Sequence, residues 1–228
     1  MTLTLLEALS APRPSTRLQA ALTAGTRPDQ RTLDALVARC AIEPDFFVRD
    51  MLTWAITRHA PGLTVPRLIH ELGSANPQAR SQALHTLSKI GDRRAWPAIG
   101  VRLLHDPDDE VARSAWRAAV VLVPGEERAA LAATLATELG RGDRATQLSL
   151  SRALIALDED AAPMLAAARS DPDPRTRTHA VATEQLMADP DAGFAYAIDE
   201  ARRIVALGPD TGTEKETGTD TGHPDAGQ

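Results

Sequence analysis

A repeat of just over thirty residues constrains this chain more than any other feature of its sequence. Arginines recur in matching sequence contexts, such as "PQARSQALHTL" and "EVARSAWRAAV", at steps of 31, 33 and 64 residues. These arginines are Arg49, Arg80, Arg113 and Arg177, and Thr146 stands in the place left by the double step. Self-similarity at such a period is the signature of stacked structural units. We therefore interpret the chain as five related units.

Two further features keep the same register. Pro66, Pro97 and Pro163 precede the arginines near expected helix starts, where proline is tolerated because the first N–H groups of a helix are unpaired. A turn precedes each second helix; the turns are Glu43-Pro44, Asn76-Pro77, Asp106-Pro107, Gly142-Asp143 and Asp171-Pro172. Each unit thus reads as helix, turn, helix. One such pair cannot bury its apolar face alone, so the pairs must stack.

The composition agrees with an all-α protein. Alanine and leucine are abundant, and only 3% of the residues are aromatic. The prolines, turns and arginines together resemble the HEAT-repeat family of armadillo-like solenoids, over Pro28 to Pro190. The fourth unit departs from the family pattern, with Ala130, Gly142 and Thr146 at three of its positions. We predict an all-α fold, an α-solenoid of about five HEAT-like helix pairs with capping helices at both ends.

The repeat also divides the chain. We expect an N-terminal capping segment at 1–27, the solenoid at 28–190, a C-terminal capping helix at 191–207 and a disordered acidic tail at 208–228. The first capping helix is expected from Ser15, as its N-cap, to Ala24, and the second from Asp191 to Ala206. The tail holds five acidic residues against Lys215 and no large apolar side chain, so it cannot bury enough surface to order itself.

The sequence argues against catalysis. It contains no phosphate-binding loop, dinucleotide-binding motif or nucleophile elbow. His70-Glu71 resembles one of the iron-binding pairs of deoxyhypusine hydroxylases, but those sites need several pairs. We expect no catalytic residue, no metal and no cofactor. The single cysteine, Cys40, excludes an intrachain disulfide. With no signal peptide or membrane-length apolar run, we expect a cytoplasmic protein without membrane contact.

The resemblance to HEAT repeats implies a structural role for the arginine column. In that family this arginine bonds to acidic turn residues of the adjacent unit. Arg49, Arg80, Arg113 and Arg177 would then form an internal ladder. Direct contact of these arginines with a partner is the alternative.

The resemblance also places the second helix of each unit on the concave surface. The stretches 48–59, 78–90, 111–123, 145–157 and 175–187 carry nine basic and two acidic residues, although the whole chain has a net charge of −6. Ser81, His85, Ser88 and Lys89 share one helix face, and Asp50, Trp54, Thr57 and Arg58 are their equivalents 31 residues earlier. We predict a mildly basic binding face formed by Trp54, Arg58, His85, Lys89, Arg117 and Val121.

Two placements stay open on the sequence alone. Trp54 can turn into the core or stand exposed as an interface anchor. In the third unit the matching residues are Ser114, Ala118, Val121 and Leu122. The apolar run 118–123 there can be core or the floor of a peptide groove.

The predicted function is a non-catalytic scaffold that binds an acidic or helical protein segment on its concave face. The acidic tail is one candidate competitor for that face. The alternative is nucleic-acid binding, as in the HEAT-like alkylpurine DNA glycosylases. A net charge of −2 without the tail and only three tryptophans argue against it. Kinship with bilin lyase-like HEAT proteins is a third hypothesis, supported by the repeat alone.

Overall fold

The computed structural model describes residues 4–189, 191 and 193–207, and these residues form helices and turns without a strand. The acidic tail, 208–228, lies outside the described residues. The all-α solenoid predicted from the repeat is confirmed. The α-helices are α1 (Leu5–Leu9), α2 (Pro14–Thr26), α3 (Leu33–Cys40), α4 (Phe46–Thr57), α5 (Pro61–Glu71), α6 (Pro77–Ile90), α7 (Val101–Leu104), α8 (Asp109–Leu122), α9 (Arg128–Ala136), α10 (Arg144–Leu157), α11 (Ala162–Ala168), α12 (Pro174–Ala188) and α13 (Phe194–Leu207).

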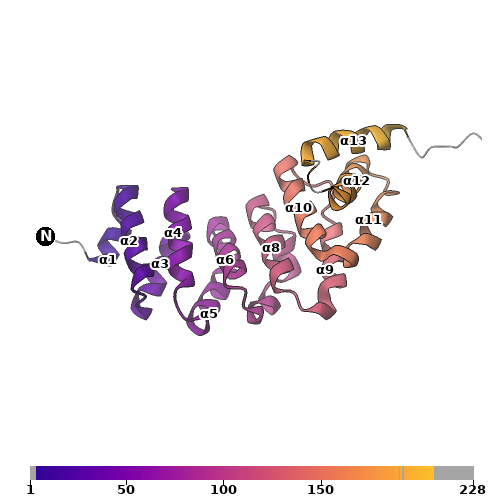
Figure 1. Cartoon of the computed structure of the whole chain (residues 1–228). Coiled ribbons are helices and arrows are strands. Elements are labelled where there is room, and N and C mark those ends of the chain that lie inside the picture. The colour runs from indigo at the N-terminus through magenta and orange to yellow at the C-terminus, as the bar shows by residue number, and fades with distance from the viewer. Residues whose placement is uncertain (1–3, 190, 192, 208–228) are drawn as a thin grey trace, which may run out of the picture.

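The even-numbered helices α2 to α12 are the second helices of successive pairs, and they stand side by side along the array (Figure 1). The first helices, such as α5 and α9, lie on the other side. Short 3₁₀ turns precede several first helices. One continuous hydrophobic core runs between the two rows from α1 to α12. The second helices therefore share one exposed face, which carries the predicted site.

The turn chemistry explains where the second helices begin. Asp45, Asn76, Asp108, Asp143 and Asp173 are the N-caps of α4, α6, α8, α10 and α12, and each side chain accepts a hydrogen bond from a backbone N–H of the first turn. Such caps satisfy N–H groups that have no partner within the helix. Because the caps are equivalent, counting residues from the N-cap gives a common register for all second helices.

The N-terminal segment differs from the expected single helix. Helices α1 and α2 form a further helix pair, and α2 packs on α4 as a second helix. Helix α2 begins at Pro14 with Arg13 at its N-cap, so the predicted N-cap at Ser15 is wrong. Proline fits the first helical position without loss of a hydrogen bond, which moves the start ahead of Ser15.

The proline column is only partly as predicted. Pro163 lies in the first turn of α11. Pro66, however, lies inside α5, and it is Pro61 that occupies the first turn of that helix. Pro97 lies inside a 3₁₀ helix, Arg93–Ala98, and not in the short α7 that follows. A proline inside a helix removes a backbone donor, so Pro66 and Pro97 each interrupt the hydrogen bonding of their own helix.

At the C-terminal end the stack does not simply continue. Helix α13 lies across α12 and the neighbouring end of α10, at the upper right of Figure 1. Its buried residues form a small separate core with α12 and with Leu148 and Ile155 of α10. This helix covers the face that the other second helices leave open.

Candidate functional site

The register of the second helices is marked by four arginines that stand four residues after the N-cap. In Arg17, Arg49, Arg80 and Arg177 the Nη1 donates to the carbonyl oxygens six and five residues earlier, at 2.7–3.3 Å. Each arginine thus closes its own interhelix turn. Sequence reasoning missed Arg17, although it lies 32 residues before Arg49 and "PRPSTR" matches "PDPRTR".

Arg113 does not belong to this ladder, which corrects the prediction. Ala112 stands four residues after the N-cap of α8, and Gln147, rather than Thr146, holds the equivalent position in α10. Arg113 instead pairs with Glu110 of its own helix at 2.7 Å. The carbonyl of Asp106, which a ladder arginine would bind, receives Arg141 from the following turn. Aligning arginine with arginine had shifted α8 by one residue.

Two ladder arginines also join adjacent units. Arg17 holds Glu43 with two contacts of 2.7 Å, and Arg80 holds Asp106 at 2.9 and 3.0 Å. Burial alone would raise the pKa of Glu43. The hydrogen bonds from Arg17, the Asp45 N–H and Arg39 outweigh burial and lower this pKa to about 2. Arg49 and Arg177 bond only to their own turns within the described residues. These arginines fix the scaffold on which the exposed face lies.

The six predicted binding residues form two rows on the open part of the face. Trp54, His85 and Arg117 are each nine residues after an N-cap, and we call them the central row. Arg58, Lys89 and Val121 are each thirteen residues after an N-cap, and we call them the outer row. The two rows cross α4, α6 and α8. The corrected register makes Arg117, rather than Ala118, the counterpart of His85.

Trp54 is neither a core residue nor a freely exposed one. Its indole ring packs against Gly25 of α2, so closely that a Cβ at Gly25 would lie 2.1 Å from the ring. The residue remains 37% exposed. Glycine at this position therefore lets the ring lie flat against the neighbouring helix with its outer side open. A supported aromatic of this kind loses little side-chain entropy on binding.

A groove crosses α4, α6 and α8 beside the central row, and His85 and Arg117 of that row line it. It consists of two adjoining hollows of about 410 and 300 Å³, both lined by Arg49, Gln82 and Glu110. The larger hollow is also lined by Phe46, Asp50, Thr53, His85, Ser114 and Arg117. Phe46 and Phe47 are 65% and 71% exposed and lie edge to face at the start of α4. Sequence reasoning missed this aromatic rim, although no other unit has an aromatic residue in the two positions where this unit has "FF".

Cations that lack an anionic partner among the described residues lie in the groove, at Arg117, and beside it in the outer row, at Arg58 and Lys89. Among the described residues Arg58, Lys89 and Arg117 form no ion pair; the Nη2 of Arg117 bonds only to Ser114 Oγ, at 3.0 Å. Burial lowers the pKa of Arg117, and the nearby Arg113 adds to this effect. Burial also lowers the pKa of His85, and the positive charges of Arg117 and Lys89 add to this effect. Such a surface is electrostatically suited to an anion.

The apolar run 118–123 belongs to the core. Ala118, Ala119, Leu122 and Val123 are buried, and only Val121 is strongly exposed, at 49%. The run therefore does not form the floor of a groove. Trp116 is fully buried as well, and its indole N–H donates to the Leu104 carbonyl at 2.9 Å.

A buried serine–histidine contact occurs under α13, but it is structural. Ser151 Oγ lies 3.0 Å from His179 Nε2, and both residues are buried. His179 Nδ1 accepts the Gly140 N–H, so Nε2 carries the proton and also faces the Gln147 carbonyl at 3.0 Å. Burial lowers the pKa of His179 to about 4. His179 of α12 is therefore bonded both to the turn at Gly140 and to α10, and its role is structural.

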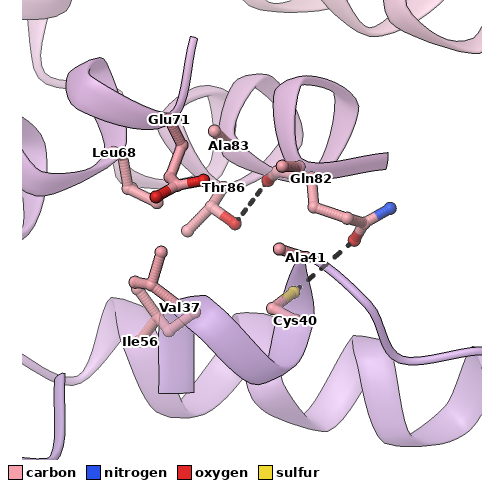
Figure 2. A pocket seen from close by; sticks show the side chains of 10 residues that line it. Val37, Cys40, Ala41, Ile56, Leu68, Glu71, Gln82, Ala83 and Thr86 are labelled. Carbon is pink, nitrogen blue, oxygen red and sulfur yellow. Dashed lines mark hydrogen bonds between the residues drawn. The ribbon is translucent and has the colours of Figure 1, made fainter. Parts of the chain in front are cut away.

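Other candidate chemistry is likewise absent from the described residues. His70 is exposed on α5, and no group of three potential metal ligands occurs in this part of the chain. Cys40 borders a small pocket of about 10 Å³ between the first and second helices (Figure 2), room for about one water. Burial raises the pKa of its thiol to about 12. No helix in the described ranges is both long and apolar enough to cross a bilayer.

Comparison with known proteins supports the fold. No protein-family model matches the sequence, and no curated protein matches it. A crystal structure of a Kap121p mutant matches with a TM-score of 0.53 and 18% identity, over 86% of this chain and 24% of that chain. This chain thus spans about a quarter of that helical solenoid. The likeness is one of fold.

Two further matches are weaker. An engineered protein matches with a TM-score of 0.47 and 17% identity, over 89% of this chain and 95% of that one. The complex of CpcE and CpcF of phycocyanin lyase from Nostoc sp. PCC7120 matches with a TM-score of 0.36 and 18% identity, over 89% and 95%. The observed fold and the Kap121p match define the class as a helical-repeat solenoid.

Proposed function

We propose that this chain is a non-catalytic interaction module of the HEAT-repeat kind that binds a protein segment in the groove across α4, α6 and α8. One observation carries the proposal. The face of the second helices is hollowed along these three helices and no other described residue covers it, whereas α13 covers the equivalent face of α12 and part of that of α10. A surface that the chain covers at one end and leaves open at the other is suited to a partner from outside.

The chemistry of the groove supports a protein ligand. Exposed aromatic groups lie beside cations that have no anionic partner in the described structure. Aromatic residues and arginine are enriched where protein interfaces are strongest. Asp50 and Glu110 also line the groove, so the surface is mixed in charge rather than uniformly basic. A phosphate backbone, by contrast, is bound by many lysine and arginine contacts.

The test compares two charge-matched double variants of the full chain. Arg58→Glu with Lys89→Glu changes the outer row, and Arg93→Glu with Arg102→Glu changes exposed cations of the first-helix side. Each tagged variant is incubated with nuclease-treated native lysate after circular dichroism has shown that it is folded. We expect a protein that is captured by the wild type and by the Arg93/Arg102 variant but not by the Arg58/Lys89 variant.

Two outcomes contradict the proposal. Equal capture by all three proteins would place binding elsewhere on the molecule. Capture of nuclease-sensitive material alone would favour the nucleic-acid alternative. In that case log affinity should fall steeply and linearly with log salt.

A further inference from the structure

The central row extends beyond α4, α6 and α8 when the common register is followed in both directions. The ninth residue after the N-cap is Leu22 in α2 and Arg152 in α10. In α12 it is Ala182, which α13 buries. The row on the open face therefore runs, from the N-terminal to the C-terminal end, through Leu22, Trp54, His85, Arg117 and Arg152.

The residues of the central row change from apolar at its N-terminal end to cationic at its C-terminal end. Its first two members are apolar and 40% and 37% exposed. Its last two members, Arg117 and Arg152, are exposed cations that form no ion pair within the described residues. His85 lies between them and is half-buried; its pKa is lowered, which favours the neutral ring near pH 7. An aligned ligand thus meets apolar surface at one end and positive charge at the other.

The distance between neighbouring helices determines how far apart the contacting groups of a ligand must lie. Packed helices lie about 8–10 Å apart, so the two steps from Trp54 to Arg117 cover about 20 Å. An extended chain advances about 3.3 Å per residue and crosses that distance in about six residues. An extended segment across the helices would therefore place groups six residues apart over these two side chains.

The open part of the face also has a closed end. Beyond Arg152 the face is occupied by α13, and Asp199 of α13 pairs with Arg144 of α10 at 3.1 Å. The chain's own helix thus already provides one example of a carboxylate against a cation of this face. A bound segment would end beside α13.

We infer that the central row, with the groove beside it, selects an extended peptide carrying an aromatic or aliphatic residue and a carboxylate about six residues apart. The apolar residue lies against Trp54 and the carboxylate against Arg117, next to Arg152, which has no ionic partner among the described residues. The partner is an acidic protein segment of this pattern. The inference rests on the proposed function and adds the orientation and spacing of the ligand.

The probe is a library of random 16-residue peptides displayed on phage and selected on the full-length chain. Selected sequences are synthesised with a fluorophore, and their Kd values are measured by anisotropy. We expect a consensus with an apolar residue and an acid five to seven residues apart. Inserting three glycine or serine residues between the apolar residue and the acid should weaken binding about tenfold. With the longer spacing only one of the two groups can contact its site at a time.

Double-mutant cycles assign each anchor to its residue. Changing the peptide acid to its amide and changing Arg117→Ala should each weaken binding about tenfold, and the two changes together no further. Trp54→Ala should behave in the same way toward the apolar residue. Arg93→Ala, an exposed cation on the opposite side, is the control and should leave the Kd unchanged.

The outcomes separate this inference from the proposed function. Peptides that lose binding with the Arg117→Ala or Trp54→Ala variants but show no acid, or no fixed spacing, would overturn the inference and leave groove binding intact. If no selected peptide depends on either residue, both the spacing rule and the groove as a peptide site are wrong.

Discussion

The second helices present the same face twice, open over α4 to α8 in the described residues and covered over α12 and part of α10. In the open region the positions nearest the groove are polar or aromatic, such as Asp50 and His85. In the covered region the equivalent positions include Leu148 and Ile155, which contact α13. The backbone architecture is shared, so side chains at a few register positions decide whether the face binds within the chain or remains open.

The two regions are also held together differently. The open region relies on arginines at the turns, with the ion pairs Arg17–Glu43 and Arg80–Asp106 linking adjacent units. The ladder has no arginine at Ala112 of α8 or Gln147 of α10 and resumes at Arg177 of α12, and around α10 and α12 the chain adds the buried bonds of His179 and the apolar cover of α13. Hydrogen bonds and ion pairs at the turns leave the exposed face of the second helices accessible. An apolar helix packed on that face buries it.

The largest effect is expected from the ladder. Arg80→Ala leaves the buried Asp106 without its guanidinium partner, and we expect a loss of about 3–5 kcal/mol in the free energy of unfolding. Arg113→Ala is the control, because among the described residues Arg113 bonds only to Glu110 of its own helix, and it should cost about 1 kcal/mol or less. Urea denaturation measures both. Equal losses would mean that the corrected register of α8 is wrong.

Opening the covered region should have the next largest effect. Ile198→Ala removes a side chain that is 2% exposed between α13 and its core, and we expect a loss of about 2–4 kcal/mol. Ile204→Ala on the same helix removes a side chain that is 40% exposed and should cost about 0.5 kcal/mol. Thermal unfolding and binding of a hydrophobic dye report both. If Ile198→Ala neither destabilises the chain nor exposes apolar surface, the contrast between an open region and a region covered by α13 is wrong.

Mild acid should weaken the covered region before the ladder. His179 has a pKa of about 4 when folded and 6.5 otherwise, so between these values the unfolded chain binds more protons. Its stabilising contribution is complete above pH 6.5 and is lost as the pH falls toward 4, by about 1 kcal/mol at pH 5.5. Hydrogen exchange of α12 amides at pH 7 and 5.5 measures this. His179→Gln should reduce the pH dependence in that window.

The ladder should respond at lower pH. Glu43 has a folded pKa of about 2 against an ordinary value of 4.5, so its contribution is present above pH 4.5 and lost below it. Exchange in α2 and α4 should therefore change little between pH 7 and 5.5. A parallel rise in α2, α4 and α12 over that interval would contradict the separation of the two regions.

The smallest effects on stability are expected in the groove itself. Lys89→Ala and Arg117→Ala remove exposed cations with no ionic partner in the described residues, and each should change the free energy of unfolding by about 0.5 kcal/mol or less. The same variants should weaken ligand binding. A loss of stability comparable to that of Ile198→Ala would assign these side chains to the scaffold instead of to a binding face.

Much of this arrangement could be predicted from the chain alone because the repeat depends on local chemistry. Asp or Asn caps, prolines and 3.6-residue periodicity act within a few residues, so they located the second helices closely. The same logic gathered Trp54, His85, Arg58 and Lys89 on one face. It failed at Arg113, where matching residue types outweighed the one-residue difference in spacing, and at Arg17, whose unit begins near the chain terminus.

The sequence by itself determined the helix pairs, their stacking and the mildly basic second helices, since each follows from capping, periodicity and the need to bury apolar faces. Only the tertiary structure decided which stretch of the face stays open. That depends on α13 crossing back over Leu148 and Ile155, and on Gly25 lying beneath Trp54. These are contacts between residues distant in the chain, and their geometry is set by how the whole stack curves and packs.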